Sequence, residues 1–254
     1  MYLGRNGAGK TTLLSILTSQ NPATSGQVTL DGQPVWENPQ VLKNLCFSRE
    51  LNPMIGNNGN AMKVKEYLKI AETFFPYWDK EMANQLVKDF DLDVKKRIGK
   101  LSKGMLSMVT IIVALASKAP FTFLDEPVAG LDVVAREKFY GLLIDEYTQT
   151  GRTFVISTHI IEEAADVFEE VIIVDKGNVL LKENTQELLE RCCHVSGHES
   201  EVDKAVAGME QHREERLGRS KGVTVVMKPG QKISQEYDVH IQKVNLQKLF
   251  VALC

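Results

Sequence analysis

The sequence predicts an α/β fold with a mostly parallel sheet. Apolar runs that suit buried parallel strands, at 121–124 and 153–157, alternate along the chain with segments of helical periodicity. Of the 254 residues, 43% are hydrophobic, which is ordinary for a protein with a buried core. This length fits one large domain with a small appendage.

The composition excludes several classes of protein. The 30 Lys and Arg residues against 33 Asp and Glu give a net charge of −3, which argues against nucleic acid as a partner because phosphate backbones bind basic surfaces. No stretch approaches the ~20 apolar residues that span a bilayer, and Lys10 interrupts any signal peptide. Four cysteines do not form a disulfide framework in a chain this long, so we expect a reducing compartment.

Local signals predict the elements of the first two thirds of the chain. A strand is expected at 45–48, and residues 63–90 have the periodicity of two helices divided by Pro76. Ser102 is expected to cap the helix that follows it. Two hairpins are expected, at 27–30 and 33–35 around Asp31-Gly32, and at 171–174 and 179–181 around Lys176-Gly177-Asn178.

After about residue 183 the character of the sequence changes, and we interpret 183–254 as a small accessory region. Its strand-like pieces are 223–227 and 237–241, and an apolar helix pattern closes the chain. The mixed charges of 210–219 favour a solvated helix face. Cys192-Cys193-His194 with His198 lacks the usual spacing of metal ligands, so we expect no metal site there.

The segment from Gly4 to Thr11 matches the pattern G-x-x-x-x-G-K-[ST] at every fixed position. Glycines allow a tight turn whose N–H groups point at phosphate oxygens, and the helix that follows adds the positive end of its dipole. Lys10 is expected to reach the β- and γ-phosphates of a nucleotide, and the Thr11 hydroxyl to bind Mg²⁺. The expected nucleotide-binding residues in this segment are Gly4, Arg5, Asn6, Gly7, Ala8, Gly9, Lys10, Thr11 and Thr12.

Two acids follow the apolar run 121–124. Asp125, at the carboxyl end of a parallel strand, can hold Mg²⁺. Glu126 points to the other side of the strand, where it can orient or deprotonate a water molecule. Such a pair alone is usually just a turn, but the phosphate-binding loop upstream favours the catalytic interpretation.

Together these motifs resemble the nucleotide-binding subunit of an ABC transporter, a P-loop NTPase of ABC type. The family's Leu-Ser-Gly-Gly-Gln signature is similar to Leu101-Ser102-Lys103-Gly104-Met105. The loop after the two acids is similar to Ala129-Gly130-Leu131-Asp132, and His159 matches the switch histidine. The resemblance implies an ATPase domain at 1–182, with a helical subdomain near 60–117.

The resemblance also implies a dimer, of identical or different subunits, with two ATP molecules and Mg²⁺ at its interface. Ser102 and Gly104 of one subunit would contact the γ-phosphate held by Lys10 of the other. Glu126 would be the general base, His159 would contact the γ-phosphate and the water, and Asp132 would act across the dimer. The further partner would be a membrane permease, which places the chain at the cytoplasmic face of the cell membrane.

The chain departs from the family pattern in two motifs. Lys103 and Met105 replace Gly and Gln of the signature, a form that resembles a branch of ABC ATPases serving separate permeases, many of them exporters. Glu50 occupies the position of the family's glutamine after the strand 45–48. Its carboxylate can still approach Mg²⁺, but it cannot donate the amide hydrogen bond. Residues 52–54 would lie where the ATPase meets its permease.

Only three residues precede Gly4, where the family has ~25 or more that supply two strands and an aromatic residue stacking on adenine. We expect a truncated start, with a natural fragment as the alternative. The predicted function is ATP hydrolysis that drives transport, with export as the expected direction. The alternative hypothesis is a non-catalytic nucleotide-binding or regulatory subunit, weakened by the short N-terminus and by Glu50.

Overall fold

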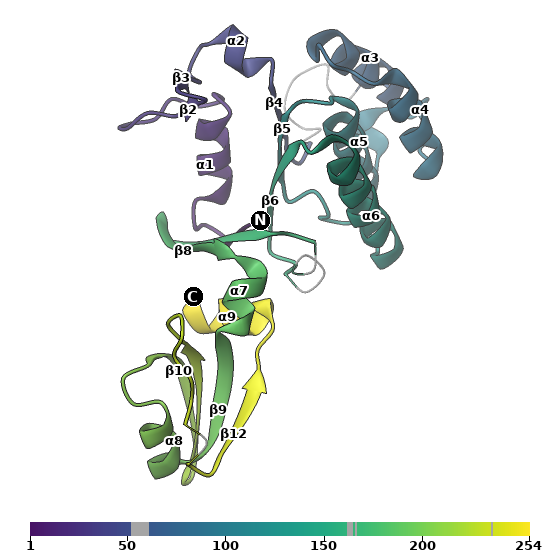
Figure 1. Cartoon of the computed structure of the whole chain (residues 1–254). Coiled ribbons are helices and arrows are strands. Elements are labelled where there is room, and N and C mark those ends of the chain that lie inside the picture. The colour runs from purple at the N-terminus through teal and green to yellow at the C-terminus, as the bar shows by residue number, and fades with distance from the viewer. Residues whose placement is uncertain (52–60, 162–164, 166, 235) are drawn as a thin grey trace. The chain divides into compact units, whose positions relative to one another are not determined.

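The computed structural model describes residues 1–51, 61–161, 165, 167–234 and 236–254, in two compact units. One, here called the contiguous unit, consists of Gly9–His159 with Tyr2. The other, here called the split unit, consists of Met1, Leu3–Ala8 and Ile160–Cys254. Residues 52–54, predicted to face a permease, lie outside the described residues. Figure 1 labels the elements of both units.

A parallel sheet forms the centre of the contiguous unit, as the apolar runs predict. Its strands are β4 (Leu45–Ser48), β5 (Phe121–Asp125) and β6 (Thr153–Thr158), in the order β4-β5-β6. Both neighbouring pairs are parallel, with Leu45 opposite Phe121 and Asp125 opposite Ser157. Leu124 and Ile156 are completely buried, so the sheet carries the core of this unit.

The helices of the contiguous unit begin where the sequence provides a cap or a turn. They are α1 (Lys10–Leu17), α2 (Pro39–Leu42), α3 (Val64–Phe74), α4 (Lys80–Asp89), the 3₁₀ helix η1 (Ile98–Lys100), α5 (Lys103–Ala116) and α6 (Val133–Thr150). The Ser102 side chain caps α5, and Pro76 falls between α3 and α4, as predicted. Ten of the fourteen residues of α5 are buried, and Figure 1 shows α3 and α4 beside it.

Both predicted hairpins are confirmed. In the contiguous unit, β2 (Thr29–Leu30) pairs with β3 (Gln33–Pro34), and both turn residues have positive φ, 51° at Asp31 and 78° at Gly32. In the split unit, β7 (Glu170–Asp175) pairs with β8 (Asn178–Asn184). Lys176 and Gly177 also have positive φ, at 47° and 80°. Two such residues in a row match the twist of the flanking strands.

In the split unit, β1 (Tyr2–Gly4) lies beside β7, with the Ile172 N–H donating to the Met1 carbonyl at 2.8 Å. A Cβ on Gly4 would lie 2.8 Å from the Val174 side chain and 2.9 Å from its carbonyl oxygen. The close approach of the two backbones at the start of the phosphate loop therefore requires glycine. Helix α7 (Thr185–Glu190) follows β8.

The rest of the split unit is a four-stranded antiparallel sheet with the order β10-β11-β9-β12, of which Figure 1 labels β9, β10 and β12. Its elements are β9 (Cys192–His198), α8 (Glu199–Ala205), β10 (Glu210–Leu217), β11 (Ser220–Val226), β12 (Val239–Lys243) and α9 (Leu246–Leu253). Val195, Val223 and Val225 of the sheet pack with Val202 and Val206 in and after α8, and all five are buried. The predicted closing helix is confirmed.

The prediction of a helix face at 210–219 is wrong, because these residues form strand β10. Seven of its eight residues are exposed, so it has no apolar alternation that could distinguish a strand from a solvated helix. Cys192 and Cys193 are buried neighbours in β9, a strand that the sequence analysis did not predict. The division into 1–182 and 183–254 stays a prediction, although the four-stranded sheet itself begins after residue 191.

A buried ion network joins three elements of the contiguous unit. Glu146 on α6 is 2% exposed, and its carboxylate lies 2.8 Å from Lys118 Nζ and 3.0 Å from Arg152 Nε. The Arg152 guanidinium also donates to the Leu115 carbonyl of α5 at 2.8 Å. Desolvation by burial lowers the pKa of Arg152, and the nearby Glu146 charge opposes this. The network therefore fastens the start of β6 to the ends of α5 and α6.

Among the described residues, no helix combines the length and the apolarity needed to cross a lipid bilayer.

Glu146→Gln is expected to lower the free energy of unfolding by about 3 kcal/mol, because it leaves the buried Arg152 and the partly buried Lys118 without the charge of this carboxylate. Urea denaturation followed by circular dichroism measures this loss. Asp145→Asn, at the exposed neighbouring position of α6, is the matched control and should have the midpoint of the parent chain. Equal midpoints for the two variants would contradict a stabilising role of the network.

Candidate functional site

The glycine-rich loop leads into α1 through two left-handed residues. Gly7 has φ 81° and Gly9 has φ 98°, and a Cβ added at either position would meet open space. These glycines are needed for their backbone conformation, since L side chains rarely adopt it. Within the loop, the Ala8 N–H donates to the Arg5 carbonyl at 3.1 Å.

The start of α1 suits a phosphate group. Its N-cap residue is Gly9, so no side chain caps the first N–H groups of the helix. Lys10 occupies the first helical position, and Thr12 lies exposed in the same turn. An anionic phosphate fits here for three reasons: the first N–H groups have no side-chain cap, the helix dipole has its positive end at this point, and a lysine lies beside it.

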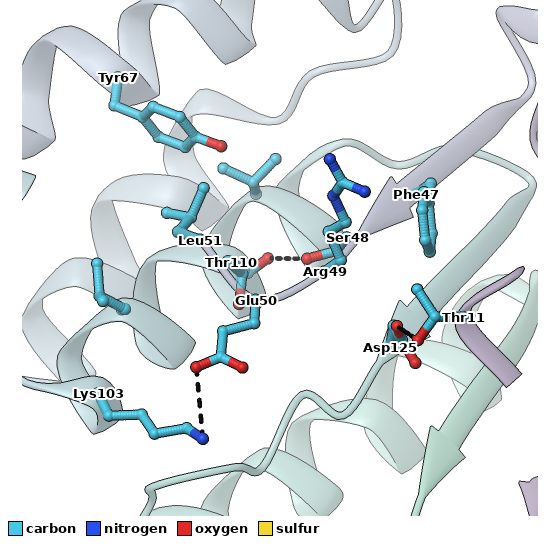
Figure 2. A pocket seen from close by; sticks show the side chains of 12 residues that line it. Thr11, Phe47, Ser48, Arg49, Glu50, Leu51, Tyr67, Lys103, Thr110 and Asp125 are labelled. Carbon is cyan, nitrogen blue, oxygen red and sulfur yellow. Dashed lines mark hydrogen bonds and ion pairs between the residues drawn. The ribbon is translucent and has the colours of Figure 1, made fainter. Parts of the chain in front are cut away.

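Two oxygen-bearing side chains meet beside this helix start. The Thr11 hydroxyl donates to Asp125 Oδ2 at 2.5 Å, and Figure 2 shows the two side chains facing each other. The other oxygen of Asp125 accepts a hydrogen bond from the Ser157 hydroxyl. A hydroxyl and a carboxylate are the hard oxygen ligands that Mg²⁺ prefers, so the residues present fit this metal ion.

The Glu126 carboxylate contacts both Lys10 and His159. Its Oε1 lies 3.6 Å from Lys10 Nζ, and its Oε2 lies 2.6 Å from His159 Nδ1. The backbone of Glu126 has φ 52°, which is unusual for a residue with a side chain, and its N–H donates to the Ser157 carbonyl at 3.0 Å. The turn after β5 is thus held in the conformation that directs this carboxylate to Lys10 and His159.

The signature segment packs tightly on the loop between Glu126 and Asp132. A Cβ on Gly104 would lie 2.5 Å from the Gly130 carbonyl oxygen, so no larger residue fits there without a shift. The Ser107 hydroxyl donates to the Ala129 carbonyl at 2.6 Å, in a buried position. Asp132 caps α6 by accepting from the Ala135 N–H at 2.8 Å. The start of α5 therefore packs against the loop that leads into α6.

Glu50 lies in a cavity of about 930 Å³ that Thr11 and Asp125 also line. Figure 2 shows its carboxylate turned toward Lys103, whose Nζ lies 3.4 Å from Oε1. Tyr67 lines the same cavity, and burial raises the pKa of its phenol. The structure thus joins Glu50 to the signature helix.

The predicted site residues fall into three groups. Hydrogen bonds and ion pairs bring together Lys10, Thr11, Asp125, Glu126 and His159. Gly104 packs on the Gly130 loop, Ser102 and Asp132 cap α5 and α6, and Glu50 pairs with Lys103. Ser107 and Ser157 are site residues that the sequence motifs do not identify. Ser157 ends the predicted strand 153–157 and lies opposite Asp125 in the sheet, and this position was the available signal.

Comparison with known proteins places the chain in a family. The sequence model of the ABC transporter family matches residues 1–129, about half of the chain. The chain is 25% identical over 205 residues to the ABC transporter ATP-binding protein YtrB of Bacillus subtilis, which covers 80% of this chain and 69% of that protein. It is 30% identical over 190 residues to the taurine import ATP-binding protein TauB of Burkholderia thailandensis, covering 68% of this chain and 65% of TauB.

Other relatives are much longer than this chain. It is 31% identical over 184 residues to human ATP-binding cassette sub-family A member 2, which is 70% of this chain but 7% of that protein. Among solved structures, an ATP-binding subunit of an ABC transporter has a TM-score of 0.62 at 21% identity, covering 74% of this chain and 80% of that one. The dimeric cassette MJ0796 bound to ADP and Pi has a TM-score of 0.61 at 23% identity, covering 72% and 84%.

These structural likenesses confirm the predicted α/β fold of ABC type. The match to the family model, the phosphate loop and the acids at the end of β5 agree with one another. The chain belongs to the ABC transporter family, as an ATP-binding subunit that is an ATPase.

Proposed function

We propose that this ATPase drives export of a substrate through a separate membrane permease, from the cytoplasmic face of the membrane. The observation that carries the catalytic part is the group of five side chains around the ends of β5 and β6. The export direction is supported by the Lys103 and Met105 form of the signature. TauB is named as an import protein, so direction needs its own experiment.

The proposed roles follow from the contacts. The loop from Gly4 to Lys10 would hold the phosphates of ATP, and Thr11 and Asp125 would hold Mg²⁺. The metal ion, when bound, neutralises charge that develops on the phosphate oxygens. Glu126 would accept the proton of the attacking water while the bond between the β–γ bridging oxygen and the γ-phosphorus breaks. His159, at 2.6 Å, would fix the direction of the Glu126 carboxylate.

In the proposed dimer, the second subunit supplies the signature residues that complete each ATP site. Ser102 caps α5, so the positive end of this helix lies beside the signature residues. In the proposed arrangement, the start of α5 of one subunit contacts the γ-phosphate that the other subunit binds. Two copies, or one copy and a different ATP-binding subunit, would then enclose two ATP molecules.

Transport direction can be measured in proteoliposomes that contain the chain with its permease. ATP is added outside, where it reaches the chains whose ATPase side faces outward. Export from the cytoplasmic side then appears as ATP-dependent accumulation of substrate inside the vesicles. Release of preloaded substrate on addition of ATP would contradict export.

Glu126→Gln is expected to lower ATP turnover by at least about 100-fold, because the amide cannot accept the proton of the water. Phosphate release measures turnover, and a fluorescent ATP analogue checks that binding is kept. Glu137→Gln, on the exposed face of α6, is the control and should hydrolyse ATP at the rate of the parent chain. If the parent chain with its permease binds ATP but shows no turnover, the chain is a non-catalytic nucleotide-binding subunit.

Thr11→Val is expected to raise the Mg²⁺ concentration needed for half-maximal nucleotide binding by about tenfold, because the hydroxyl ligand is lost. Thr11→Ser keeps the hydroxyl and should stay close to the parent chain. A fluorescence titration with Mg²⁺ at fixed nucleotide concentration measures both variants. Equal values for Val and Ser would exclude Thr11 as a metal ligand.

Ser102→Ala is expected to reduce ATP-dependent dimerisation, measured by light scattering in a Glu126→Gln background that cannot turn ATP over. The change also removes the cap of α5, which costs about 1 kcal/mol of stability. Asn245→Ala removes the comparable cap of α9, where Asn245 accepts from the Lys248 N–H at 2.8 Å. The Asn245→Ala control should lose its helix cap and still dimerise. Unchanged dimerisation of Ser102→Ala would argue against a contact between Ser102 and a second subunit.

A further inference from the structure

The two motifs in which the chain departs from its family pattern contact each other. Glu50 Oε1 lies 3.4 Å from Lys103 Nζ, so an acid at the glutamine position pairs with a base in the signature. The family motifs that the sequence resembles have glutamine and glycine at these two positions, and neither residue carries a charge. The contact therefore links two departures that the sequence presents as separate.

The pair is exposed and lies close in sequence to a buried hydrogen bond. The side chains of Glu50 and Lys103 are 52% and 56% exposed. Two residues before Glu50, the Ser48 hydroxyl donates to the Thr110 carbonyl of α5 at 3.0 Å, in a buried position (Figure 2). A buried hydrogen bond thus joins the end of β4 to α5, two residues before the exposed ion pair. The two contacts involve different side chains, so the ion pair can open without breaking this hydrogen bond.

The charges that line the cavity show what the pair controls. The cavity is lined by two acids, Glu50 and Asp125, and by two bases, Arg49 and Lys103. Both oxygens of Asp125 already accept hydrogen bonds, from Thr11 and Ser157. Within the described part of the chain, the Glu50 carboxylate forms an ion pair with Lys103. Figure 2 shows the Glu50 carboxylate turned toward Lys103 and not toward Thr11 and Asp125.

We propose that Lys103 competes with Mg²⁺ for the Glu50 carboxylate, and so sets the metal concentration at which nucleotide binds. This inference rests on the proposed Mg²⁺ site at Thr11 and Asp125. While the ion pair is closed, the carboxylate is withheld from that site. In this proposal Mg²⁺ binds with nucleotide to the open form, so the apparent affinity for the metal is the intrinsic affinity multiplied by the fraction of molecules that are open.

The size of the effect follows from the exposure of the pair. Exposed ion pairs have small coupling energies, equivalent to about a two- to fivefold preference for the closed form. The ion pair thus lowers the affinity for the metal only moderately, and added salt weakens the ion pair. Lys103 is a positioning residue in this proposal, since it acts through Glu50.

The test is a Mg²⁺ titration of fluorescent ATP-analogue binding to the full chain, at fixed nucleotide concentration and without turnover. Lys103→Met is expected to lower the half-saturating Mg²⁺ concentration about three- to sixfold, because a two- to fivefold preference for the closed form leaves about one third to one sixth of the molecules open. Glu50→Gln is expected to raise it. The double variant should match Glu50→Gln, because Lys103 then has no carboxylate to withhold. An unchanged value for Lys103→Met, or an equal decrease in the Glu50→Gln background, would overturn the proposal.

Three controls separate this proposal from others. Lys103→Arg keeps the cation and should behave like the parent chain. Lys100→Met removes an exposed cation three residues before Lys103, and should leave the half-saturating concentration unchanged. Asp125→Asn should remove most of the Mg²⁺ dependence. If the parent chain binds nucleotide without any Mg²⁺ dependence, the proposed metal site fails, whereas a normal dependence with no effect of Lys103→Met overturns only the competition.

Discussion

The parallel pairing of β5 with β6 is the constraint on which the rest of the site depends. With Asp125 opposite Ser157, the ends of the two strands lie level, and the residues that follow each strand emerge together. Asp125 ends one strand, Glu126 follows it and His159 follows the other strand, so the register brings these groups to the same edge of the sheet. A shift by one residue would move alternate side chains to the opposite face of the sheet and separate them.

A second constraint couples the signature helix to this strand end. The backbone contact between Gly104 and Gly130 and the buried Ser107 hydrogen bond hold α5 against the loop that follows Glu126. Because both contacts involve backbone atoms, neither helix start can move without the loop. The two ends of this loop, at Glu126 and Asp132, therefore respond together to a displacement of α5.

Much of this arrangement could be predicted from the sequence, because the relevant signals are local. The fixed residues of the phosphate loop, the Asp31-Gly32 turn and the Ser102 cap each determine the backbone within a few residues. The contacts that could not be predicted are long-range ones between short polar side chains. Ser107, Ser157 and the Glu50–Lys103 pair have no periodic pattern, and only the folded sheet brings them to their partners. Strand β10 was mistaken for a helix because pairing with β11, and not apolar burial, defines it.

The exposed character of β10 has a consequence for the behaviour of the protein in concentrated solution. This strand forms one edge of the four-stranded sheet, and it carries five charged residues in a stretch of eight. A β-bulge between His212 and Glu215 interrupts its regular pairing. Charges and irregularities on an open edge discourage the addition of a further strand from another molecule. The polar sequence that conceals this strand from prediction is thus also a protection against aggregation through backbone pairing.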